Sequence, residues 1–162
     1  HKRINDKKLK IDENSILIIR GCGPVGYPGS AEVVNMQPPD RLLKKGIIHL
    51  PTLGDGRQSG TSESPSILHV SPESAVGGDL GIVKTGDKMK IDLNKRRVDL
   101  LISQLEFKKR RKNKKLFKAN NQTPWQEIFR DTVGQLEDGA CINSRGNYLD
   151  ISNKKGLPRN SH

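Results

Sequence analysis

The chain has no long hydrophobic run. Its uninterrupted apolar stretches are only a few residues long, whereas a helix that crosses a bilayer needs about 20 apolar residues. No segment resembles a secretory signal peptide or a membrane span. We therefore expect a protein without a membrane partner.

Aromatic residues and cysteines are also scarce. Aromatic residues make up 4% of the 162 positions and hydrophobic residues 32%, which predicts one domain with a modest core that buries apolar surface against a partner. Cys22 and Cys141 stand far apart, without a C-x-x-C pair or the spacing of a metal site. We expect reduced thiols of a cytoplasmic protein, which cannot hold a metal cluster by themselves.

Positive charge is abundant and concentrated in one tract. The formal net charge is +11, and the segment Lys108–Lys115 (KKRRKNKK) contains seven basic residues in eight. Such a tract is typical of nucleic-acid-binding proteins, but it lacks interleaved aromatic residues and a recognisable binding motif. Good helix formers run from Leu105 to Lys118. We therefore expect a solvated helix face and only weak, salt-sensitive nucleic-acid binding.

The first of two glycine-rich loops follows the strand-like run Ile16–Ile19. Its residues 21–26 (GCGPVG) match G-x-G-x-x-G, the dinucleotide-binding motif. A dinucleotide site needs a helix to begin within this motif, and Pro24 and Pro28 disfavour one. No second strand ending in an acid follows at the required distance. We therefore interpret the segment as a rigid loop that places one carboxylate, Glu32, near the start of a short helix.

The second loop, residues 53–66 (LGDGRQSGTSESPS), combines glycines with hydroxyl side chains. Its glycines permit positive φ or a close approach to a ligand, and Ser59, Thr61 and Ser62 place hydroxyls at the same location. A flexible polar linker would have a similar composition. Because the loop is short and lies between two strand-like segments, we predict a defined turn with a functional role.

The pattern of the whole chain predicts a mixed α/β fold. The expected elements are strands at 16–19 and 47–53, short helices at 31–36 and 38–45, and a basic helix at 105–118. Alternating apolar residues over 80–102, interrupted by turns, predict an antiparallel meander with one buried face. Thr123, Pro124 and Gln126 have the residue types of the N-cap, N1 and N3 positions of a helix that runs toward Leu136.

Several of these segments together resemble one enzyme family. The segments GCGPVGYPGSAEVVNM and LLKKGI, and the stretch from GDGRQSGT to VDLLIS, resemble the C-terminal domain of the iron–sulfur dihydroxy-acid and sugar-acid dehydratases. The match runs from about Ile16 to Ser103. The motifs TPWQEI, VGQLEDGA and GLPR are similar to those of the family's pentonate branch. The resemblance implies a swivelling β/β/α, barrel-like domain with a helical C-terminal extension.

The resemblance also implies a reaction, the dehydration of a sugar acid to a 2-keto-3-deoxy acid. D-xylonate or a related aldonate is the expected substrate, and the branched dihydroxy acids of amino-acid synthesis are the alternative. In this family a [2Fe–2S] cluster takes the C3 oxygen, while Mg²⁺ binds the carboxylate and C2 oxygen and a base removes the C2 proton. The implied partners are the chain's own N-terminal domain and further copies, as a dimer or tetramer.

The family's motifs assign roles to particular residues. Ser59 corresponds to the catalytic base, and Thr61 to a group that positions substrate or shares the proton. Glu32 corresponds to a Mg²⁺ ligand, and Arg57 to a substrate contact. From the residues alone, Ser59 is equally a turn residue, Glu32 a helix-end acid, and Arg57 with Asp55 a loop-fixing ion pair.

Three parts of the chain follow from this interpretation. Residues 1–15 are expected to be a linker from an N-terminal domain, 16–103 the β/β/α domain, and 104–162 a basic helix and helical tail. The cluster ligands are expected in the N-terminal domain, so the chain by itself is expected to be inactive. The alternative is a small standalone domain that binds nucleic acid through its basic tract.

Overall fold

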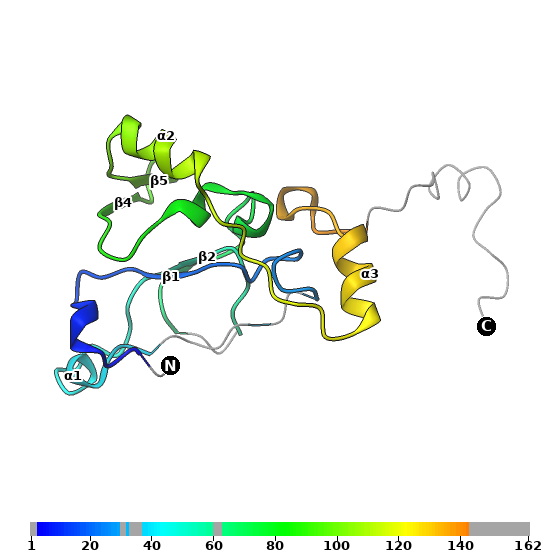
Figure 1. The fold of residues 1–162 in the computed structure, drawn as a ribbon. Coiled ribbons are helices and arrows are strands. Elements are labelled where there is room, and N and C mark those ends of the chain that lie inside the picture. Colours follow the sequence, from blue (N-terminus) through cyan, green and yellow to red (C-terminus); the bar gives the residue numbers. More distant parts are fainter. Residues whose placement is uncertain (1–2, 30–31, 33–36, 60–62, 143–162) are drawn as a thin grey trace, which may run out of the picture.

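The computed structural model describes residues 3–29, 32, 37–59 and 63–142, and a small parallel sheet lies at its centre (Figure 1). The sheet consists, in spatial order, of β1 (Leu17–Ile19), β2 (Thr52–Gly54) and β3 (Ser66–Ile67). The middle strand is buried at all three positions. The strand predicted at 16–19 is thus confirmed to within one residue, whereas only the end of the segment predicted at 47–53 is regular strand.

A second, separate sheet is an antiparallel hairpin. Its strands are β4 (Met89–Asp92) and β5 (Arg97–Leu100), with Ile91 paired to Val98. The predicted meander was too long, because Ile82 belongs to the 3-10 helix η3 (Asp79–Ile82). The two sheets share no strand, so the described residues form no closed barrel. The mixed α/β content agrees with the prediction, and the barrel-like arrangement is not observed.

The helices are short. They are α1 (Asp40–Leu43), α2 (Gln104–Lys112) and α3 (Pro124–Thr132), with the 3-10 helices η1 (Lys7–Leu9), η2 (Ser74–Val76), η3 and η4 (Leu136–Asp138). The helices predicted at 38–45 and 105–118 were therefore too long. The helix predicted at 31–36 lies, apart from residue 32, outside the described residues.

The start of α3 is the element that the sequence predicted best. The Thr123 side chain accepts a hydrogen bond from the Gln126 N–H at 3.3 Å and caps the helix. The helix ends at Thr132 and does not continue through Gly134, a residue that disfavours helix interiors. Leu136 therefore lies in η4 and not on the apolar side of α3.

Three apolar clusters connect these elements. One joins β1 and α1 to the N-terminal segment through Leu17, Leu42 and Leu50, with Ile4, Ile11 and Ile47 at its edge. A second joins the parallel sheet to the hairpin through Leu53, Leu80 and Val83, with Met89 and Leu100 among its edge residues. A third joins the first glycine loop to the end of α3 through Val25, Ala75 and Val133 with Phe129 and Ala140. Residues 3–15, expected to be a linker, thus contribute Ile4 and Ile11 to packing.

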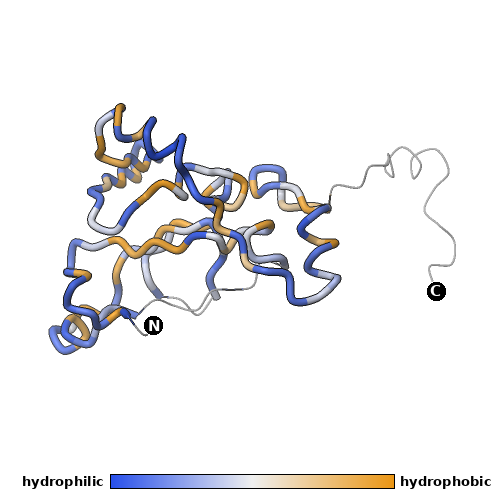
Figure 2. The backbone as a smooth tube through the Cα atoms, viewed as in Figure 1, coloured by the Kyte–Doolittle hydropathy of each residue, from blue (hydrophilic) through white to orange (hydrophobic). Residues whose placement is uncertain are grey.

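Hydropathy follows this layering. Figure 2 shows hydrophobic residues along the central strands and mainly hydrophilic residues along α2, which contacts η3. Among the described residues, no helix is both long and apolar enough to cross a bilayer.

Candidate active site

The two glycine-rich loops leave the same edge of the parallel sheet. β1 and β2 run parallel with Ile19 opposite Gly54, so the loops that begin at Arg20 and Asp55 start side by side. Loops at the carboxyl ends of parallel strands are the usual location of ligand sites in α/β proteins. The topology therefore brings together two loops that are more than thirty residues apart in the sequence.

Asp55 binds the two loops to each other. Its carboxylate is fully buried and accepts hydrogen bonds from the N–H groups of Gly21 and Cys22, both at 3.0 Å. The N–H of Ser74 donates to the same carboxylate at 2.9 Å, and the Ser74 hydroxyl donates to it as well. A loop-fixing ion pair of Asp55 with Arg57 was one of two interpretations of the sequence, beside substrate contact. The structure shows instead a buried carboxylate held by backbone donors.

A second buried carboxylate, Glu73, holds the next part of the first loop. It accepts hydrogen bonds from the N–H groups of Val25 at 2.9 Å and Gly26 at 2.8 Å, and from the Gln135 side chain at 2.9 Å. A Cβ atom at Gly23 would lie 2.4 Å from a Glu73 oxygen, so only glycine fits there. Glu73 therefore ties the loop to the segment that follows α3.

These contacts occupy the backbone donors of the G-x-G-x-x-G motif that a dinucleotide site would use. No helix begins within residues 20–29. The backbone N–H groups that would face a pyrophosphate donate instead to the protein's own carboxylates, Asp55 and Glu73. The rejection of a dinucleotide site thus has a direct structural reason.

The structure places three of the four predicted site residues on these loops. Arg57 Nη1 lies 3.6 Å from Glu32 Oε1, and each side chain is 48% exposed. Ser59 follows on the same loop as Arg57 and is partly buried. Next to it, the Gln58 side chain accepts a 2.7 Å hydrogen bond from the Ser66 hydroxyl and so fixes the loop to β3. Thr61 lies outside the described residues.

Sequence reasoning missed four residues that organise the site: Asp55 in its actual role, Glu73, Ser74 and Gln135. Their contacts join positions 19 to 62 residues apart, so no local pattern contains them. The only signal in the sequence was the presence of two acids beside glycine-rich segments.

The described residues do not fit an iron–sulfur cluster. No group of three His, Cys, Asp or Glu side chains comes together in this part of the chain. Burial, and then the charge of Asp55, raises the pKa of the Cys22 thiol, which favours the protonated form over the thiolate that binds iron. Cys141 is exposed and lies elsewhere. Glu32 is a half-exposed carboxylate beside Arg57, and within the described residues no two further His, Cys, Asp or Glu side chains join it as possible metal ligands.

The two inner histidines are not core residues. His69 is exposed and has a φ of 55°. His49 is partly buried, with its Nε2 atom 3.4 Å from a Glu63 carboxylate oxygen. The apolar sequence neighbours of His49 and His69 predict satisfied core positions, and this prediction is wrong because neither residue is buried.

The basic tract is anchored at its centre. Arg110 donates to both carboxylate oxygens of Asp87, at 2.5 and 3.0 Å, and to Glu106 at 2.6 Å. The side chains of Arg110 and Asp87 are only 11% and 10% exposed. The Lys114 ammonium donates to the Gly77 carbonyl. The expectation of a solvated helix face therefore holds for only part of the tract.

The Asp87 pair predicts a pH-dependent stability. The hydrogen bond from Arg110 holds the pKa of Asp87 below its usual range, so the pair stabilises the fold at neutral pH and loses this effect as pH falls through the lowered pKa. Asp87→Asn should lower Tm by several degrees at pH 7, with the difference from wild type shrinking below about pH 4. Circular-dichroism melting curves of both proteins between pH 7 and about pH 3 measure this difference in Tm. Asp99→Asn, in an exposed pair with Arg97, should change Tm little, and a pH-independent loss for Asp87→Asn would contradict the assignment.

Comparison with known proteins places the chain in a family. Residues 1–140 match the family model described as dihydroxy-acid/6-phosphogluconate dehydratase, C-terminal. The chain is 56% identical over all its 162 residues to the D-xylonate dehydratase of Caulobacter vibrioides, and covers 27% of that protein. It is 50% identical over 108 residues, 67% of the chain, to the L-arabinonate dehydratase of Rhizobium leguminosarum bv. trifolii, and covers 19% of that protein.

A more distant relative belongs to another branch. The chain is 39% identical to the dihydroxy-acid dehydratase of Thermodesulfovibrio yellowstonii over 142 residues, 87% of the chain. It covers 25% of that protein. The chain thus spans about a quarter or less of the length of these relatives and corresponds to their C-terminal part. It belongs to the dihydroxy-acid/6-phosphogluconate dehydratase family.

Proposed function

We propose that the chain is the base-bearing C-terminal part of a hydro-lyase that dehydrates a sugar acid to its 2-keto-3-deoxy acid. D-xylonate is the first candidate substrate, and related aldonates follow. The observation that carries the proposal is the 56% identity to a D-xylonate dehydratase over all 162 residues. The convergence of the Ser59 loop and the Glu32 loop at one edge of the sheet supports it.

The chemistry assigns different tasks to the two loops. Ser59 Oγ removes the proton from C2 of the substrate, a step that requires a lowered hydroxyl pKa and therefore nearby positive charge. Glu32 would hold Mg²⁺, which supplies positive charge for the substrate carboxylate and C2 oxygen. Arg57 lies 3.6 Å from Glu32 and orients the Glu32 carboxylate. The same guanidinium also binds the substrate. No step is assigned to an iron–sulfur cluster, because the described residues do not fit one.

A chimeric enzyme tests this function. The corresponding C-terminal segment of the Caulobacter vibrioides D-xylonate dehydratase is replaced by this chain, and 2-keto acid formation is measured. We expect activity on D-xylonate, and none when the segment is deleted. L-arabinonate, D-gluconate and 2,3-dihydroxyisovalerate complete the panel. A folded chimera that acts on the branched acid in preference to every aldonate would establish the alternative, a dihydroxy-acid dehydratase.

Two kinds of partner accompany this proposal. The N-terminal part of the same enzyme completes the site, and copies of the whole enzyme assemble as a dimer or tetramer. Light scattering of the chimera measures the assembly, and a monomeric active enzyme would contradict it.

Glu32 provides a test of metal binding. Glu32→Gln keeps most of the side-chain shape and removes the charge, so the Mg²⁺ concentration for half-maximal activity should rise by at least about tenfold. Because the side chain is half exposed, the stability should change by less than about 0.5 kcal/mol. Glu13→Gln, at an exposed position, serves as the control. An unchanged Mg²⁺ requirement with a lower Tm would identify Glu32 as a structural acid instead.

A further inference from the structure

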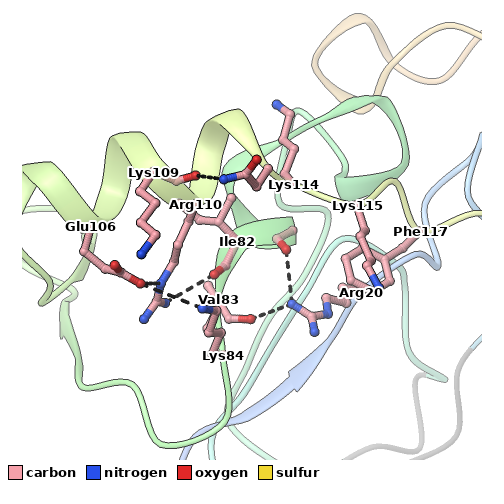
Figure 3. A pocket seen from close by; sticks show the side chains of 12 residues that line it. Arg20, Ile82, Val83, Lys84, Glu106, Lys109, Arg110, Lys114, Lys115 and Phe117 are labelled. Atoms are coloured by element: carbon pink, nitrogen blue, oxygen red, sulfur yellow. Dashed lines mark hydrogen bonds and ion pairs between the residues drawn. The ribbon is translucent and has the colours of Figure 1, made fainter.

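A basic cavity lies beneath α2 and adjoins the start of the first glycine-rich loop at Arg20. It has a volume of about 300 Å³, is open on one side, and is lined by Arg20, residues 81–84, α2 and the segment 113–117 (Figure 3). None of the predicted site residues lines it. Its size lies at the lower end of the range for small-molecule pockets.

The cavity walls carry a large excess of positive charge. Six cations line it: Arg20, Lys84, Lys109, Arg110, Lys114 and Lys115. Glu106 is the one acid in the lining, and it is already paired with Arg110 at 2.6 Å and lies 3.8 Å from Lys84. Asp87 neutralises Arg110 further.

Four of the lining cations form no ion pair within 4.0 Å in the part of the chain that the structure describes, although the charge of Lys109, after the hydrogen bond from Arg110, helps to lower the pKa of Glu106. They are Arg20, Lys109, Lys114 and Lys115. Lys114 donates only to the Gly77 carbonyl. Figure 3 shows the Lys114 side chain directed away from Arg20, so Arg20, Lys109 and Lys115 are the remaining lining cations without a close carboxylate among the described residues. Cations that line a partly open space raise the local concentration of anions. The uncompensated charge therefore predicts an anionic occupant.

Arg20 is held in an orientation suited to such an occupant. Its Nη1 atom donates to the carbonyls of Val83 at 2.6 Å and Gly81 at 3.3 Å, and its guanidinium lies 4.2 Å from the centre of the Phe117 ring. Within the described residues, the Nε and Nη2 groups of Arg20 have no hydrogen-bond acceptor. A fixed guanidinium with free N–H groups binds an oxyanion without a further ordering cost.

We propose that this cavity binds a small phosphate monoester. A phosphate monoester carries nearly two negative charges at neutral pH and three acceptor oxygens, which match the Arg20 fork and the flanking lysines. A monocarboxylate would compensate only one of these charges. A nucleic-acid strand would need a continuous groove and stacking surfaces, whereas the one aromatic residue of the lining, Phe117, already lies against Arg20.

Titration calorimetry on the complete protein that carries this chain tests the proposal, with glycerol 3-phosphate and inorganic phosphate as probes and D-xylonate as the monocarboxylate comparison. We expect both phosphates to bind, more weakly at higher salt, and D-xylonate not to compete with them. The double variant Lys109→Gln/Lys115→Gln should raise the Kd for glycerol 3-phosphate by at least about tenfold. Lys44→Gln/Lys45→Gln, at exposed positions outside the cavity lining, should leave it within about twofold.

A second variant separates shape from charge. Arg20→Lys keeps the positive charge but loses the forked guanidinium, so it should also weaken the binding of glycerol 3-phosphate. The melting curve of this variant checks that it is folded. Absence of phosphate binding, or equal binding in the pocket and control variants, would overturn the proposal. The proposal would also be overturned if a single-stranded oligonucleotide bound more tightly than glycerol 3-phosphate and this binding disappeared in the same pocket variant. None of these readouts depends on dehydratase activity.

Discussion

Ser59→Ala should lower kcat of the complete enzyme by at least about a hundredfold, because removal of a general base costs this much or more. The substitution removes one hydroxyl from a partly buried loop position and should therefore leave Tm nearly unchanged. KM should change much less than kcat, because the hydroxyl acts on the proton in the transition state and not on substrate binding. Steady-state kinetics of 2-keto acid formation measure both.

Ser64→Ala is the matched control for this prediction. Ser64 belongs to the same loop segment, is also partly buried, and lies 3.1 Å from the Ser66 hydroxyl. It should retain nearly full activity. If Ser59→Ala kept more than about a hundredth of the wild-type kcat, the proton-transfer role would pass to Thr61 or to another group.

Asp55→Asn should destabilise the protein by about 3 kcal/mol or more. The carboxylate is fully buried and accepts four hydrogen bonds, from the N–H groups of Gly21, Cys22 and Ser74 and from the Ser74 hydroxyl. A carboxamide presents an NH₂ group in place of one acceptor oxygen, so at least one buried N–H donor faces another donor. Each buried donor left without a partner costs about 1–3 kcal/mol.

Urea denaturation measures this loss, and activity provides a second readout. Asp55 holds the Gly21 end of one loop against the start of the Ser59 loop, so kcat should fall together with stability. Asp131→Asn, at an exposed position on α3, should be neutral in both assays. A stable Asp55→Asn protein would show that contacts other than those of Asp55 hold the two loops together.

The sequence by itself was sufficient for features that depend on neighbouring residues. The β1 strand, the hairpin turn between β4 and β5, and the capped start of α3 at Thr123 all follow from local patterns. The motifs of the two glycine-rich loops were also sufficient for the family. These features share one physical property, which is that the interactions that determine them lie within a few positions along the chain.

Only the tertiary structure decided how the loops are joined. An ion pair of Asp55 with Arg57, two positions away, was one of two interpretations of the sequence, and Asp55 instead accepts hydrogen bonds from Gly21 and Ser74. The burial of Arg110 against Asp87 likewise depends on a partner distant in the sequence. A buried polar group takes whatever partner the packed fold provides, because leaving it unpaired costs more than any local preference gains. Local patterns therefore identified the loops of the candidate site, and long-range packing determined which of their residues hold it together.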